Sequence, residues 1–119
     1  MFGALKRLWN WRKRSTDPKI RFDANGFEFA DHKGKRYAVA WTNVTELWGY
    51  KMDLLTSHRV YFYFKLRKGP GIEISEEQPG FKELLPALKE RFPGVNGWEG
   101  KILRPVPGRN ETLLYRRTS

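Results

Sequence analysis

The chain has 119 residues, of which 39% are hydrophobic and 15% aromatic; this is enough for one folded domain with a core rich in large rings, and it excludes a disordered chain. The absence of cysteine excludes disulfides, thiolate nucleophiles and cysteine-containing zinc sites. No segment approaches the roughly 18 apolar residues of a membrane span, and no apolar run marks a secretory signal. We therefore expect a cytoplasmic protein.

The formal net charge of +10 is distributed unevenly along the chain. Residues 1–16 hold five of the 23 basic residues and none of the 13 acidic ones, so they carry +5, and the remaining 18 basic and 13 acidic residues carry the other +5. Such a balance favours polyanionic partners, namely anionic lipid, an acidic protein or nucleic acid.

Residues 1–16 are predicted to form a basic amphipathic helix, separate from a single domain over residues 17–119. On a helical wheel the aromatic and aliphatic side chains fill one half and the basic ones the other, with Arg12 alone on the apolar half. This pattern is typical of a helix in the interface of an anionic membrane, attached peripherally. A helix packed on its own domain and an organelle transit peptide remain alternatives. The residues expected to contact the membrane or partner are Phe2, Leu5, Lys6, Arg7, Trp9, Trp11, Arg12, Lys13 and Arg14.

Strand patterns follow, beginning with a hairpin. The dipeptide Asn25-Gly26 is typical of a two-residue type I′ turn, which would place Phe22 opposite Phe29. Turn residues and alternation predict six strands in meander order. Their expected ranges are Lys19–Ala24, Phe27–Ala30, Lys35–Trp41, Val44–Asp53, Arg59–Arg67 and Gly71–Ser75.

The segment Arg59–Arg67 has the strictest alternation and is predicted to be the central strand. Its expected core face consists of Val60, Phe62, Phe64 and Leu66. Its opposite face is a possible ligand face, consisting of Arg59, Tyr61, Tyr63, Lys65 and Arg67. Two tyrosines between three cations suit phosphate groups or stacked bases, although the N-terminal helix lying across them would explain the same residues.

A helix is predicted next, because Ser75-Glu76-Glu77-Gln78 matches a capping box. Its apolar stripe is expected to consist of Phe81, Leu84, Leu85, Leu88 and Phe92, with a kink at Pro86. Beyond it, Trp98–Arg104 and Glu111–Arg117 are predicted to form edge strands or an appended hairpin.

Catalytic chemistry finds little support in the sequence. His32 and His58 both lie beside turns, where a histidine is exposed, and no pair of histidines has metal-ligand spacing. Glu76 and Glu77 are explained by helix capping more simply than as a general acid and base. We therefore expect no enzyme activity, no cofactor and no metal.

A family resemblance is carried by AWTNVTELWGYKMDLL (40–55), VYFYFKL (60–66), GIEISEEQPGFKELLPALKERFP (71–93) and TLLYRR (112–117). Together they resemble a family of small uncharacterised bacterial proteins with a pleckstrin-homology-like fold. The resemblance spans Arg36–Arg117 and implies a binding scaffold, without assigning functional residues. The strand expected after the helix departs from the usual pleckstrin-homology order, which ends on the helix.

Taken together, these patterns predict an α+β fold, in which a strongly bent antiparallel sheet or partly open barrel is closed by one amphipathic helix. The expected function is that of a non-enzymatic binding module, attached peripherally to anionic membrane or to a partner surface. An immunity-type inhibitor that binds a partner protein and a single-stranded nucleic-acid-binding protein are the alternatives.

Overall fold

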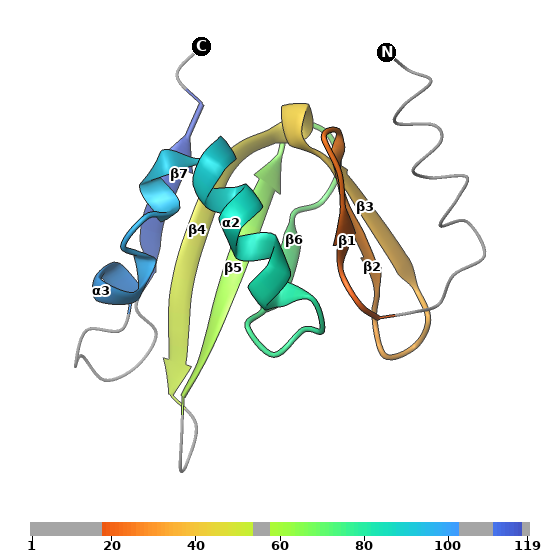
Figure 1. The fold of residues 1–119 in the computed structure, drawn as a ribbon, viewed down its shortest axis with the longest axis horizontal. Helices are drawn as coiled ribbons and strands as arrows, with labels where there is room; N and C mark the ends of the chain where they lie inside the picture. Colours follow the sequence, from red (N-terminus) through yellow and green to blue (C-terminus); the bar gives the residue numbers. More distant parts are fainter. Residues whose placement is uncertain (1–17, 54–57, 103–110, 118–119) are drawn as a thin grey trace.

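The computed structural model describes residues 18–53, 58–102 and 111–117. The predicted α+β class is confirmed, since two antiparallel sheets are accompanied by α-helices (Figure 1). The sheets are separate in their hydrogen bonding and do not close into a barrel. The predicted helix over residues 1–16 lies outside the described residues.

The first sheet, sheet A, has three strands in the order β1-β2-β3. These are β1 (Arg21–Phe22), β2 (Gly26–Ala30) and β3 (Arg36–Ala40). Phe27 pairs with Val39 and Phe29 with Tyr37, so the aromatic residues of β2 face the same side as the apolar residues of β3.

The type I′ turn predicted at Asn25-Gly26 is wrong. Phe22 pairs with Phe27, so the loop is longer than two residues. The Asp23 carboxylate stabilises this loop by accepting hydrogen bonds from the backbone N–H of Asn25 at 2.8 Å and of Gly26 at 3.2 Å. An Asx turn has therefore replaced the expected glycine turn.

The second sheet, sheet B, has four strands in the order β6-β5-β4-β7. These are β4 (Val44–Asp53), β5 (His58–Leu66), β6 (Ile72–Ser75) and β7 (Thr112–Arg116). The six predicted strands are present, but they divide into two sheets where the 3₁₀ turn η1 (Trp41–Asn43) joins β3 to β4. The predicted strand near the C-terminus is also confirmed, and β7 forms the edge of sheet B beside β4.

Helix α2 (Phe81–Arg91) begins later than the capping-box pattern predicts. The Ser75 hydroxyl accepts a hydrogen bond from the Glu77 N–H at 3.0 Å, so it caps a turn. The helix starts after Gly80, whose φ of 88° suits glycine, and it continues through Pro86. The predicted apolar stripe is confirmed: Phe81, Leu84, Leu88 and Phe92 are buried and Leu85 is partly buried.

The prediction of a strand over Trp98–Arg104 is wrong for residues 98–102, the part of this range that the structure describes. After the 3₁₀ turn η2 (Pro93–Val95), residues Trp98–Ile102 form a short helix, α3. Trp98 and Ile102 are four residues apart, so a helical turn directs both into the core.

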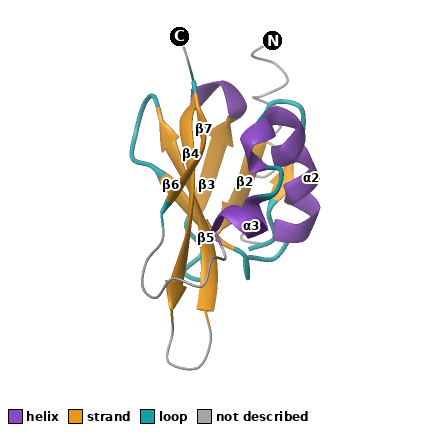
Figure 2. Ribbon diagram, turned by 90° about the vertical axis from the view of Figure 1, so that its left-hand side faces the viewer, coloured by secondary structure: helices purple, strands orange, loops and turns teal. Residues whose placement is uncertain are grey.

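One core lies between the helices and the two sheets. Figure 2 shows α2 and α3 on the same side of sheet B. The Phe62 ring has its centroid 5.3 Å from that of Phe81 in α2 and 5.5 Å from that of Trp98 in α3. The ring centroid of Phe27 in sheet A lies 5.0 Å from that of Phe64 in sheet B. The expected core face of β5 is confirmed, with Val60, Phe62 and Phe64 buried and Leu66 packed against the core.

Candidate functional site

The face of sheet B that points away from the core carries four aromatic side chains. Trp48 lies opposite Tyr63, and Tyr50 lies opposite Tyr61, in the register of β4 and β5. Side chains alternate along a strand, so these four rings share one surface, which we call the aromatic block. The sequence pattern predicted its tyrosines in β5. It did not predict Trp48 and Tyr50, because the pairing register was needed to bring them alongside.

Contacts within the protein bury much of the surface of the aromatic block. The Tyr50 ring stacks on Tyr61 with centroids 5.2 Å apart and planes at 15°, and the Tyr50 hydroxyl donates a hydrogen bond to the Glu73 carboxylate on β6. Tyr63 lies over Gly71, where an added Cβ would come within 2.1 Å of the tyrosine oxygen. Tyr61 and Tyr63 are consequently half-buried, and Tyr50 is only 3% exposed.

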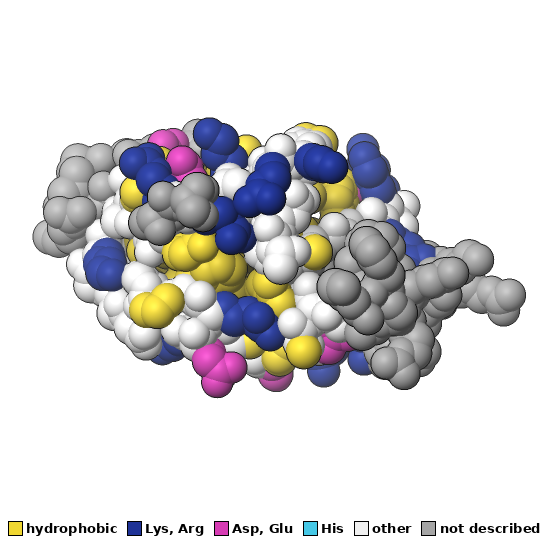
Figure 3. Space-filling view, turned by 90° about the horizontal axis from the view of Figure 1, so that it is seen from above, with side chains coloured by type: hydrophobic (Ala, Val, Ile, Leu, Met, Phe, Trp, Pro, Cys, Tyr) yellow, Lys and Arg dark blue, Asp and Glu magenta, His cyan; other side chains and the backbone are white. Residues whose placement is uncertain are grey.

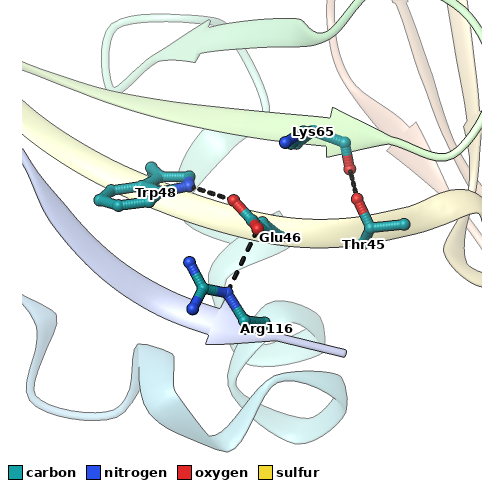
Figure 4. Close-up of polar contacts among 5 residues, drawn as sticks. All are labelled: Thr45, Glu46, Trp48, Lys65 and Arg116. Carbon is teal, nitrogen blue, oxygen red and sulfur yellow. Dashed lines mark hydrogen bonds and ion pairs between the residues drawn. The ribbon is translucent and has the colours of Figure 1, made fainter. Parts of the chain in front are cut away.

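Glu46 lies between the aromatic block and the basic residue Arg116 (Figure 4). Its carboxylate accepts a hydrogen bond from the Trp48 indole N–H at 2.8 Å and pairs with the Arg116 guanidinium at 3.2 Å. The Trp48 hydrogen bond, followed by the charges of Lys65 and Arg116, lowers the pKa of Glu46 below its ordinary value of 4.5. Beside it, the Thr45 hydroxyl donates to the Lys65 carbonyl at 3.1 Å.

The structure separates the three cations that the sequence assigns to the ligand face. Arg59, at the start of β5, pairs with Glu77 at 2.9 Å; the Tyr61 hydroxyl first, and then Glu77, raise the pKa of its guanidinium. Lys65 and Arg67 are exposed near the other end of the strand, and eight residues of strand span roughly 26 Å. A single ligand group therefore cannot contact Arg59 and Arg67 together.

A group of basic residues, which we call the basic end, surrounds the junction of η1 and β4. Backbone groups hold it in place: the Arg67 N–H donates to the Asn43 carbonyl at 2.8 Å, and the Arg117 guanidinium donates to the Val44 carbonyl at 2.8 Å. Figure 3 looks onto this end and shows dark blue Lys and Arg side chains around a yellow hydrophobic strip. The basic end consists of Lys65, Arg67, Lys68, Arg116 and Arg117.

Two hollows border the aromatic block. The first, which we call the aromatic hollow, has a volume of about 220 Å³ and is lined, among the described residues, by Trp48, Tyr50, Tyr63 and Glu111. The second has a volume of about 350 Å³ and lies between β6 and sheet A. Its lining includes Phe29, Asp31, Tyr37, Tyr61, Gly71, Ile72, Glu73, Ser75 and Gln78. Sequence reasoning missed both hollows, since neither follows from one strand alone.

The carboxylates that resemble an acid–base pair have structural partners. Glu76 accepts a hydrogen bond from the Val60 N–H at 3.0 Å, and Glu77 pairs with Arg59. His32 is exposed, as expected. Within residues 18–53, 58–102 and 111–117, no group of three or more His, Asp or Glu side chains is placed to hold a metal ion.

The predicted membrane-contact residues lie outside the described part of the chain. They are Phe2, Leu5, Lys6, Arg7, Trp9, Trp11, Arg12, Lys13 and Arg14. Among the described helices, none has the length and apolar character needed to cross a bilayer.

No protein-family model, curated protein or solved structure matches this chain.

Proposed function

We propose that this chain is a non-enzymatic binding module that attaches peripherally to an anionic membrane surface. The basic end is the observation that carries the proposal, because it gathers five cations from β5, the turn after it and the end of β7, with Glu46 paired to one of them. Residues 1–16 add five more basic residues next to a set of aromatic and aliphatic ones. Together they would supply charge attraction and interfacial burial.

The expected strength follows from the number of accessible cations. Each Lys or Arg near an anionic surface contributes about 1 kcal/mol. Lys65, Arg67 and Lys68 are exposed, whereas the ion pair with Glu46 partly neutralises the charge of Arg116. Loss of two exposed cations should therefore weaken attachment on the order of tenfold or more.

The proposal includes a pleckstrin-homology-like scaffold. Two antiparallel sheets around one core, with α2 packed over that core, support it. The position of β7, which follows α2 and pairs with β4, differs from the usual pleckstrin-homology order.

Vesicle co-sedimentation of the full chain tests the attachment. Vesicles of phosphatidylcholine alone are compared with vesicles that also contain phosphatidylglycerol, at low and high salt. Arg67→Gln/Lys68→Gln and, separately, Arg12→Gln/Lys13→Gln/Arg14→Gln should both reduce binding to the anionic vesicles. The control Lys33→Gln/Lys82→Gln removes the same charge as the first variant from exposed sites elsewhere and should retain more binding. Equal binding by all four proteins would reject the proposal.

Single-stranded nucleic acid is the second candidate, because it would use the same basic end together with Tyr63. An oligonucleotide titration with the same variants, extended to Tyr61→Ala and Tyr63→Ala, separates the two candidates. Binding by stacking requires both tyrosines and falls steeply with salt, whereas lipid attachment does not require them. An immunity-type role would instead show as a stoichiometric protein in a pulldown.

A further inference from the structure

The walls of the aromatic hollow are suited to a positive charge. Trp48 and Tyr63 supply two partly exposed aromatic side chains, the almost fully buried Tyr50 is a third, and Glu111 adds a carboxylate at the same hollow. The faces of aromatic rings carry negative potential, and several such rings around one space are the usual recognition element for alkylammonium groups. From this geometry we infer that the aromatic hollow is a binding site for a methylated ammonium cation, independent of the membrane attachment proposed above.

Hydrogen bonds to carboxylates orient two of the rings and increase their electron density. The Trp48 indole N–H donates to Glu46 at 2.8 Å, and the Tyr50 hydroxyl donates to Glu73. Donation to an anion polarises the donor group toward its ring. Both rings are therefore held in place and attract a cation more strongly than they would with water as the acceptor.

The same hydrogen bonds select the kind of cation. Because the indole N–H and the Tyr50 hydroxyl already donate to carboxylates, the charged group that the hollow offers a ligand is the Glu111 carboxylate. A primary ammonium or a guanidinium loses several hydrogen bonds to water when it enters such a space, and one carboxylate replaces only part of them. A quaternary ammonium has no N–H group to satisfy, and its methyl groups pack against aromatic carbon.

The local charge also favours a cation, although the chain as a whole is basic. Glu46, Glu73 and Glu111 lie around the aromatic block. Lys65 and Arg116 on the same face interact with Glu46, which offsets part of their field at the hollow. A ligand of about 220 Å³ or less, such as choline, fits the available volume.

The test compares choline with 3,3-dimethyl-1-butanol, in which a carbon atom replaces the charged nitrogen at the same shape. Each is titrated into the isotopically labelled full chain while the tryptophan indole N–H resonances are followed by NMR, and the spectrum of Trp48→Phe identifies the Trp48 signal. Choline should shift that signal saturably, with a dissociation constant on the order of millimolar. The neutral analogue should bind at least fivefold more weakly.

Variants of Tyr63 separate ring recognition from simple burial. Tyr63→Phe keeps the ring and should retain choline binding within about twofold, whereas Tyr63→Leu keeps only apolar volume and should weaken it about fivefold. Glu111→Gln removes the charge of the carboxylate without altering the rings, and it should weaken choline binding about threefold. Phosphatidylcholine vesicles extend the titration: a response to them as well assigns a lipid headgroup as a source, and a response to choline alone assigns a soluble ligand. An unshifted Trp48 signal with choline, or equal affinity for the neutral analogue, overturns the inference.

Discussion

Gly26 allows β2 and β3 to approach each other closely. A Cβ at this position would lie 2.0 Å from the Val39 carbonyl oxygen, a distance that requires the backbone of β3 to move. The sequence suggested a different reason for this glycine, namely the positive φ angle of a type I′ turn. In the structure Gly26 lies within β2, and Asp23 stabilises the turn.

Replacing Gly26 by alanine should destabilise the protein by about 1–3 kcal/mol, because the added methyl group overpacks a site bounded by backbone. Urea-induced unfolding, followed by tryptophan fluorescence and far-UV circular dichroism, measures the change in the free energy of unfolding. Gly100→Ala is the matched control: Gly100 lies in α3 with open space around its Cβ position. Its substitution should be neutral or slightly stabilising. Equal losses in both variants would contradict the explanation.

The candidate site could be predicted only in part at the residue scale. The alternation in β5 correctly placed Tyr61 and Tyr63 on the face away from the core. It also placed Arg59 there with no indication that Glu77 pairs with it. Trp48 and Tyr50 belong to another strand, so their part in the aromatic block depends on a register that a single-strand pattern does not contain.

Helix α2 shows which features of an element the sequence determines strongly. Its apolar stripe was predicted correctly, because residues that recur every three or four positions must share a helix face. Its start was predicted wrongly, because a serine followed by acidic residues caps a turn as readily as a helix, and Ser75 does the former. The sequence was predicted to form a strand over Trp98–Arg104, because the four-residue spacing of Trp98 and Ile102 is too short a pattern to identify the helix α3.

Pro86 is expected to weaken α2 while leaving its fold intact. It lies inside the helix, is exposed, and cannot donate the backbone hydrogen bond to the Lys82 carbonyl. Pro86→Ala should stabilise the protein by about 1–2 kcal/mol, since the restored hydrogen bond to the Lys82 carbonyl and the better helix propensity of alanine outweigh the greater freedom of the unfolded chain. Thermal and urea unfolding measure this change. Glu90→Ala, an exposed substitution in the same helix, should have a much smaller effect; a loss of stability in Pro86→Ala would contradict the explanation.

At the scale of the whole molecule, the two sheets share a core, so we expect them to unfold as one unit. Phe27 of sheet A and Phe64 of sheet B are both fully buried, with ring centroids 5.0 Å apart. The strands themselves were predictable, but their division into two sheets was not. Alternation identifies which residues face inward and contains no information about which strands exchange hydrogen bonds.

A double-mutant cycle on Phe27→Leu and Phe64→Leu should detect the coupling between the sheets. Each single substitution should lower the free energy of unfolding, and the two changes together should deviate from additivity by about 0.5–1.5 kcal/mol, as for other aromatic pairs. Fluorescence and far-UV circular dichroism should report a single coincident transition for every variant. Additive losses would show that the two rings are not coupled, and two separate transitions would show that the sheets unfold independently.

The pairing of β7 with β4 also bears on the order in which the protein assembles. Arg116 and Glu46 are neighbours across these strands although they are 70 residues apart in the sequence. The entropy of closing so long a loop makes this contact late, whereas the β4–β5 hairpin joins residues close in the chain. Until β7 arrives, the β4 edge next to the aromatic block is open to pairing with another chain. A chain in which β4 still lacks β7 therefore presents an unpaired strand edge, which favours aggregation during folding.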